Sequence, residues 1–279
     1  MSRRVAALLG GGTRFVVRIS ERGEVLHESN FETKQGADAV FAWGRELLQR
    51  YHVDALGLAM FGPIELQGED AGLWRATPKE GFTGRNIVNE MRSALAGAPI
   101  VLDTDVGAAA LAESRARGGA DVAYITVGTG VGAAVQAGGR RAGARRHPEL
   151  GHLPSTLPPD LEPYLGSCPF HGPCVEGVAS GPAIAAFAGA PAETLPDEHP
   201  VFERVSFALA RLIADIVLAH GVERIVLGGG VVDSRSFLRE RAATQAETLI
   251  AGYGAFELVI EAPHHERPGL EGALLLLDE

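Results

Sequence analysis

Lysine is nearly absent from this chain: of 25 basic residues, only Lys34 and Lys79 are lysine. Neither follows a glycine-rich turn, which excludes the P-loop, because that motif grips nucleotide phosphates with a lysine. Positive charge is also in deficit. The 35 acidic residues give a formal net charge of −10, which argues against nucleic acid as a partner bound through a general electrostatic surface.

Long apolar runs are missing as well. No run approaches the roughly 20 residues that a membrane-spanning helix needs, so no membrane partner is expected. The apolar stretch Val5–Leu9 is too short for a signal peptide and leads directly into glycines, so we expect a cytoplasmic protein. A hydrophobic content of 46% excludes disorder, and 279 residues suit one large domain or two ordinary ones.

Cysteine is scarce, and both copies, Cys168 and Cys174, fall in one heptapeptide with His171 between them. Thiolate and imidazole groups at this spacing suit tetrahedral Zn²⁺, with His152 as the nearby fourth ligand. Four protein ligands leave no open position, so the predicted zinc is structural. A disulfide, disfavoured in a cytoplasmic protein, and two unrelated buried thiols are the alternatives. We expect His147 to have a surface or supporting role.

Glycine, by contrast, is abundant, with 36 residues that cluster in turns. Glycine lets backbone N–H groups converge on an anion and lets a phosphate approach closely. Three such turns follow apolar strands, which favours a nucleotide site: Gly10-Gly11-Gly12-Thr13, Gly128-Thr129-Gly130 and Gly228-Gly229-Gly230. The second turn formally fits the dinucleotide fingerprint of an NAD-dependent oxidoreductase. That fingerprint needs a helix at the turn, whereas residues 131–136 are typical of a strand in a hairpin.

The two halves of the chain carry the same pattern of strands and glycine turns, which predicts two similar domains with a cleft between them. Strands are expected at 5–9, 15–20, 25–31, 55–60, 101–103, 123–127, 132–136, 224–227 and 258–260, with a further extended stretch at 140–144. Helices are expected at 37–51, 108–117, 174–187, 202–220, 236–251 and 270–277. Residues 153–172 show little periodicity, which is typical of a functional or ligand-held segment.

Two groups of carboxylates stand out. Asp105 follows a predicted strand and precedes a predicted helix, so it either caps that helix or acts as a general base toward a hydroxyl. Glu149 and Glu176 lie close in sequence to the predicted zinc ligands. Carboxylates of this kind suit hydrogen bonds to vicinal sugar hydroxyls, whereas each glutamate taken alone is typical of a solvated surface residue.

Taken together, these residues resemble the ROK family (repressors, open reading frames and kinases), and within it the bacterial ROK fructokinases. The resemblance covers essentially the whole chain. Its marks are Gly11–Phe15, Phe61-Gly62-Pro63, Ala76–Lys79, Thr104-Asp105-Val106, Ala108–Leu111, Ile125–Gly130, His147–His152, Cys168–Glu176, Ala179–Ile184 and Leu227–Val231.

The resemblance implies an α/β, actin-like (ribonuclease-H-like) ATPase fold with two domains around a cleft. The expected division is 1–107 plus 265–279 for one domain and 108–264 for the other, which carries a zinc loop at 152–174. It also implies ATP-dependent phosphorylation of a hexose, with fructose favoured, and Mg²⁺ to accompany ATP. Members of the family are often dimers, so a homodimer is one expectation.

The family's functional positions map onto this chain residue by residue. Asp105 matches the catalytic base. The sugar-contacting positions are Thr104, Glu149, His152 and Glu176. The zinc ligands are His152, Cys168, His171 and Cys174. The ATP site comprises Gly11, Gly12, Thr13, Thr129, Pro182, Gly228, Gly229 and Gly230.

Three positions depart from the family pattern. Leu9 replaces an acidic residue associated with the phosphate and Mg²⁺ region, and Gly107 replaces an asparagine after the base. Arg14 replaces a lysine and keeps its charge. The loss of a carboxylate near Mg²⁺ predicts a slow kinase or one with an altered substrate. A catalytically weakened homologue that senses sugar or nucleotide is the alternative function.

Overall fold

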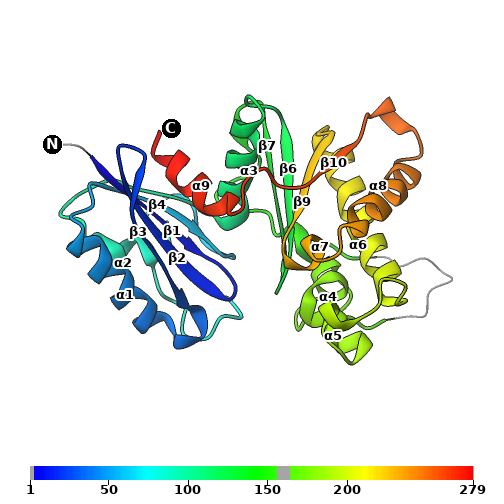
Figure 1. Ribbon diagram of the computed structural model, residues 1–279, viewed down its shortest axis with the longest axis horizontal. Helices are drawn as coiled ribbons and strands as arrows, with labels where there is room; N and C mark the ends of the chain where they lie inside the picture. The colour runs from blue at the N-terminus through cyan, green and yellow to red at the C-terminus, as the bar shows by residue number, and fades with distance from the viewer. Residues whose placement is uncertain (1–2, 156–163, 279) are drawn as a thin grey trace. The chain divides into compact units, whose positions relative to one another are not determined.

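The computed structural model describes residues 3–155 and 164–278, which form two compact units, each built on one sheet (Figure 1). Unit 1 comprises Met1–Ala116, Arg141–Pro148 and His265–Glu279, and unit 2 comprises Arg117–Arg140 and Glu149–His264. Part of the segment predicted to be irregular, residues 156–163, lies outside the described residues.

The sheet of unit 1 has the strand order β3-β2-β1-β4-β5. Glycine-containing turns join the first three strands into an antiparallel meander, and β4 and β5 run parallel to β1. The carboxyl ends of β1, β4 and β5 therefore share one edge of the sheet. The strands are β1 (Arg4–Gly10), β2 (Arg14–Glu21), β3 (Glu24–Glu32), β4 (Ala55–Met60) and β5 (Ile100–Thr104).

Helices cover both faces of this sheet (Figure 1). Large apolar residues of the strands, such as Leu8 and Leu58, point to the face covered by α1 (Ala37–Arg50) and α2 (Ile87–Arg92). Small residues such as Ala7 and Gly57 point to the other face, where α3 (Asp105–Ala116) packs against α9 (Pro268–Leu275). The period of two along each strand sorts large from small side chains.

The sheet of unit 2 has the order β10-β9-β6-β7-β8. When the strands of each unit are numbered in chain order, the two sheets have the same strand order. In unit 2, β6 and β7 form an antiparallel hairpin, and β9 and β10 run parallel to β6. The repeated pattern predicted from the sequence is thus confirmed at the level of strand order. The strands are β6 (Val122–Val127), β7 (Val131–Ala137), β8 (Arg140–Arg141), β9 (Arg224–Gly228) and β10 (Val259–Glu261).

Among the helices of unit 2, α6 packs against α8 and α4. The helices are α4 (Val175–Ala179), α5 (Gly181–Ala188), α6 (Val201–His220), α7 (Gly230–Asp233) and α8 (Phe237–Ile250). Short 3₁₀ turns occur in the chain at Thr33–Gln35, Leu150–His152, Ala192–Thr194, Tyr253–Ala255 and Leu276–Asp278. Within the described residues, no helix has both the length and the apolar character needed to span a bilayer.

Three predicted elements differ from the structure. The single helix expected at 174–187 was wrong, because Ser180 adopts an extended conformation, caps α5 through its hydroxyl and is followed by a Gly-Pro pair. The helix expected from residue 108 begins at Asp105 instead. The extended stretch at 140–144 is only two residues long, since β8 ends at Arg141.

Candidate functional site

Asp105 is the first residue of α3 and directly follows the carboxyl end of β5. The helix is capped by its neighbour Thr104, whose buried hydroxyl accepts a hydrogen bond of 3.0 Å from the N–H of Gly107. Of the two roles considered for Asp105, the cap is therefore performed by Thr104. The Asp105 carboxylate accepts a hydrogen bond of 2.9 Å from the N–H of Val106.

The surroundings of Asp105 raise the pKa of its carboxyl to about 6 from an ordinary value of 3.8. Burial is the main cause, because it disfavours the charged form, and the negative charge of Asp103 acts in the same direction. The N–H of Val106 and the positive charge of Lys79 oppose the shift. A carboxylate whose pKa is raised toward neutral pH in this way is suited to act as a general base.

The first glycine turn lies at the same edge of unit 1 as Asp105. It joins β1 to β2, and the N–H of Gly11 donates to the carbonyl of Arg14 at 2.9 Å. Gly12 and Thr13 are exposed at the tip of the turn. The structure therefore places the predicted residues Gly11–Thr13 beyond the carboxyl end of β1 and Asp105 beyond that of β5, in one sheet.

Leu9 and Gly107, which depart from the family pattern, have clear structural settings. The Leu9 side chain packs in an apolar cluster with Leu270 and approaches Gly269 of α9. A Cβ on Gly107 would lie 2.6 Å from both carboxylate oxygens of Asp103. Because Gly107 has no side chain, the Asp103 carboxylate occupies the space beside it. At position 9, leucine makes an apolar contact where the family pattern has an acidic residue.

In unit 2, the turn Gly128–Gly130 joins the antiparallel strands β6 and β7, and no helix begins there. This geometry excludes a dinucleotide-binding turn of the strand–turn–helix type. The Gly128 carbonyl instead accepts a hydrogen bond of 2.8 Å from the N–H of Gly181, at the start of α5. The predicted ATP-site residues Thr129 and Pro182, both exposed, follow these two hydrogen-bonded glycines.

The third turn, Gly228–Gly230, lies beside the end of the same strand β6. Gly229 has a φ of 97°, and a Cβ there would lie 2.6 Å from the backbone of Val127, so only glycine fits. The ATP-site residues predicted in unit 2 are thereby brought together at one edge of its sheet. The prediction missed Asp233, whose carboxylate accepts from the Gly229 N–H at 3.1 Å and pairs with Arg239.

The four predicted zinc ligands converge in unit 2. The donor atoms of His152, Cys168, His171 and Cys174 all lie within 4.8 Å of one another. The Sγ atoms of both cysteines lie 3.7 Å from Nδ1 of His152, and the two histidine Nδ1 atoms are 3.3 Å apart. Edges of a tetrahedron with zinc–ligand bonds of about 2.0–2.3 Å measure about 3.3–3.8 Å. The donor set therefore fits zinc.

The cluster of predicted zinc ligands lies beside Glu176, one of the predicted sugar-binding residues. His152 directs Nδ1 into the cluster, and its Nε2 lies 3.9 Å from a Glu176 carboxylate oxygen. The other carboxylate oxygen accepts from the N–H of Val131 at 3.0 Å. Glu149, at the start of the same 3₁₀ turn as His152, is exposed.

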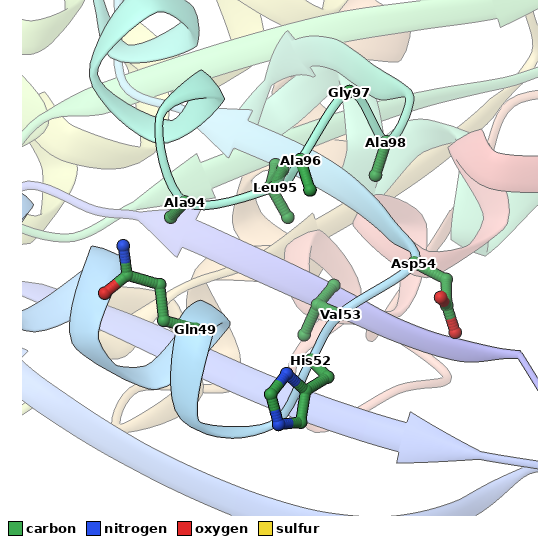
Figure 2. Close-up of a pocket in the computed structure, with 9 residues that line it drawn as sticks. All are labelled: Gln49, His52, Val53, Asp54, Ala94, Leu95, Ala96, Gly97 and Ala98. Atoms are coloured by element: carbon green, nitrogen blue, oxygen red, sulfur yellow. The ribbon is translucent and has the colours of Figure 1, made fainter.

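His147 was expected at the surface or in a supporting role, and the structure finds it buried, with Nε2 lacking a hydrogen-bond partner. It belongs to unit 1, whereas His152 belongs to unit 2. A surface hollow in unit 1, shown in Figure 2, contains none of the predicted site residues. It is lined by residues 49, 52–54 and 94–98, beside the start of β4, at the opposite end of the parallel strands from Asp105.

Two sheets of the same strand order, with glycine turns at the carboxyl ends of their parallel strands, define an actin-like ATPase fold. A ROK hexokinase from Thermus thermophilus has a similar structure, with a TM-score of 0.76 and 26% identity over 98% of this chain and 97% of that one. The family model "ROK family" matches residues 5–279, and the chain belongs to the ROK family.

Several curated relatives of this chain are fructokinases, and others at 29% identity are N-acetylmannosamine kinases. The fructokinase of Lactococcus lactis subsp. cremoris is 32% identical over 241 residues, which cover 85% of this chain and 82% of that protein. The fructokinase of Zymomonas mobilis subsp. mobilis is 34% identical over 289 residues, which cover 96% and 94% respectively. The resemblance predicted from the sequence motifs is confirmed.

Proposed function

We propose that this protein is a cytoplasmic, ATP-dependent hexose kinase that phosphorylates fructose at its 6-hydroxyl. The observation that carries the proposal is the placement of Asp105, in a ROK-family chain with fructokinase relatives. Its carboxylate stands at the carboxyl end of a parallel strand, with a pKa raised to about 6. The ionised form is then available at neutral pH, and it is more basic than an ordinary aspartate.

In the proposed reaction, Asp105 accepts the proton of the sugar hydroxyl as the hydroxyl oxygen attacks the γ-phosphorus of ATP. A bond forms between that oxygen and phosphorus, the bond to the β-phosphate oxygen breaks, and ADP leaves. Phosphoryl transfer depends mainly on positioning and on electrostatic stabilisation. The Thr104 cap and the Val106 N–H contact hold the base at a fixed point of α3.

Sugar recognition is assigned to Thr104, Glu149, His152 and Glu176. Glu176 supports this role because its carboxylate is oriented by the Val131 N–H and lies 3.9 Å from Nε2 of His152. The zinc would be held by His152, Cys168, His171 and Cys174 and would stabilise the loop without entering the chemistry. When bound, it would fix the residues that are proposed to surround the sugar.

ATP binding is assigned to the exposed first turn (Gly11, Gly12 and Thr13) and to Thr129, Pro182 and Gly228–Gly230. Mg²⁺ would accompany the nucleotide and neutralise its phosphate charge, held through the phosphates and water, as is common for this ion. Leu9, packed against α9, provides no carboxylate for it. We therefore retain the expectation of slow turnover. A homodimer remains an expectation from the family resemblance.

A steady-state assay of ADP release tests the proposed function. With ATP and Mg²⁺ we expect fructose to give the highest kcat/KM, with mannose next and glucose below both. Sugar binding by calorimetry, without ADP release from any hexose, would contradict the kinase assignment and favour a sugar-sensing protein.

The pH dependence of the same reaction follows from the pKa of Asp105. Because a general base must be deprotonated, kcat/KM for fructose should fall as pH decreases through about 6 and approach a slope of one on a logarithmic plot. The measurement is a pH profile with ATP, Mg²⁺ and buffer composition held constant. A flat profile down to pH 4.5 would show that no group of this pKa limits the reaction.

A further inference from the structure

Asp103 and Arg141 form an ion pair immediately behind the proposed base. Nε of Arg141 lies 3.0 Å from Oδ2 of Asp103, and the two side chains are only 17% and 11% exposed. The second carboxylate oxygen of Asp103 accepts a hydrogen bond of 2.7 Å from the N–H of Thr104. A buried carboxylate with a guanidinium on one oxygen and a backbone N–H on the other is well compensated.

The Asp103 carboxylate also fills the space above Gly107, in the first turn of α3. The Gly107 N–H is bound to the Thr104 hydroxyl, so Asp103, Thr104 and Gly107 together build the turn from which Asp105 projects. An additional Cβ at position 107 would collide with the carboxylate. The glycine that departs from the family pattern and the Asp103–Arg141 pair are therefore parts of one local arrangement.

Arg141 is the first residue of the segment Arg141–Pro148. This segment belongs to unit 1, although the chain before and after it belongs to unit 2. Further along this segment, Arg145 and Arg146 pair with the buried carboxylate of Glu65 at 3.1 and 2.9 Å. The segment thus has arginine–carboxylate anchors at its start and toward its end. Glu149, a proposed sugar ligand, follows directly.

We propose that Asp103 and Arg141 are a positioning pair for Asp105: Arg141 neutralises the second carboxylate beside the base and fixes both the helix start and the segment leading to Glu149. This inference rests on the proposed function, and neither residue needs to touch the substrate. The charges of Asp103 and Asp105, two positions apart in the chain, repel each other, and the guanidinium limits that repulsion.

The charged groups around Asp105 define what each substitution should do. Asp103 raises the pKa of Asp105, and Lys79 lowers it. On α9, the uncharged Gly269 lies beside the backbone carbonyl of Asp105. Replacing Asp103 with asparagine removes a negative charge and should lower the pKa of Asp105. Replacing Arg141 with glutamine removes a positive charge beside Asp103 and should raise the pKa of Asp105.

The test compares Arg141→Gln, Asp103→Asn and the double variant with wild type, using Arg140→Gln, the adjacent exposed arginine, as the matched control. We expect Arg141→Gln to lower kcat for fructose about tenfold or more, with KM for ATP unchanged, because a small misplacement of a base is costly. The acid limb of the pH profile should rise by about one pH unit. In the double variant the acid limb should return toward its wild-type position, because the carboxylate left without Arg141 is gone, and Arg140→Gln should match wild type.

A loss of kcat in Arg141→Gln with an unmoved acid limb, or an acid limb as far displaced in the double variant as in the single one, would overturn the proposal in favour of a purely structural pair. Failure of the proposed function is distinguishable, since wild type would then be inactive with every hexose. In that case, ¹³C NMR titration of the Asp105 carboxyl still tests the pair. Its pKa should fall below about 6 in Asp103→Asn, and an unchanged value would refute the assignment.

Discussion

Replacement of Asp105 with asparagine is expected to lower kcat for fructose phosphorylation by about 10³-fold, within the range that general bases contribute. The amide keeps the size of the side chain but cannot accept the hydroxyl proton. Because the helix is capped by Thr104, the local backbone should be retained. Sugar affinity measured by calorimetry should change little, so the loss should appear in kcat.

A matched control for this substitution is Asp38→Asn. Asp38 lies in the same unit, and its exposed carboxylate pairs with Arg85 on the surface, where ion pairs contribute little. Wild-type turnover is expected for this control. An Asp105→Asn variant that retains a tenth or more of wild-type kcat would contradict the role of Asp105 as the base.

The Asp105→Asn variant is also expected to be at least as stable as wild type above pH 6. The folded state raises the pKa of Asp105 above its ordinary value of 3.8, so ionisation of this carboxyl destabilises the folded state as pH rises from about 4 to 6. Asparagine removes that cost. Above pH 6, Asp105→Asn should therefore unfold at the same temperature as wild type or a higher one, which separates lost chemistry from lost folding.

Loss of the zinc site is the second large effect expected. Cys174→Ser should abolish zinc binding, lower the unfolding temperature and raise KM for fructose. Binding of a structural zinc contributes directly to the free energy of folding. Here it would join residues of the 3₁₀ turn at Leu150–His152 to the start of α4, where the Cys174 sulfur caps the helix by accepting from the Gly177 N–H at 3.3 Å.

Metal analysis and thermal denaturation measure this effect. Wild type should contain about one zinc per chain, and His171→Ala should reproduce the loss seen in Cys174→Ser. The exposed His220→Ala, at the end of α6, serves as the histidine control and should keep its metal. Wild-type protein purified without chelators that contains no zinc would overturn the metal assignment.

The features that could be predicted from the sequence are local ones. The period of two in the strands and the glycines between them indicate the meander at the start of each half. The ligands Cys168, His171 and Cys174 lie in a single heptapeptide, so their convergence needs little tertiary structure. The fourth ligand, His152, lies outside that heptapeptide, and the structure brings it into the cluster with the other three.

The features that sequence reasoning missed depend on residues distant in the chain or on the geometry of a single turn. Nothing local links Asp103 to Arg141, or Glu65 to Arg145, because each pair forms only after the segment Arg141–Pro148 packs into unit 1. The start of α3 was placed too late because the apolar pattern begins after Gly107, whereas the helix begins at the polar residue that follows the Thr104 cap.

The most direct measurement of the central claim is identification of the product by ³¹P NMR. Wild-type protein, ATP, Mg²⁺ and fructose should yield fructose 6-phosphate and ADP in equal amounts, and the Asp105→Asn sample should show neither above background. Phosphate released as inorganic phosphate, or a sugar phosphate formed equally by both proteins, would contradict the account.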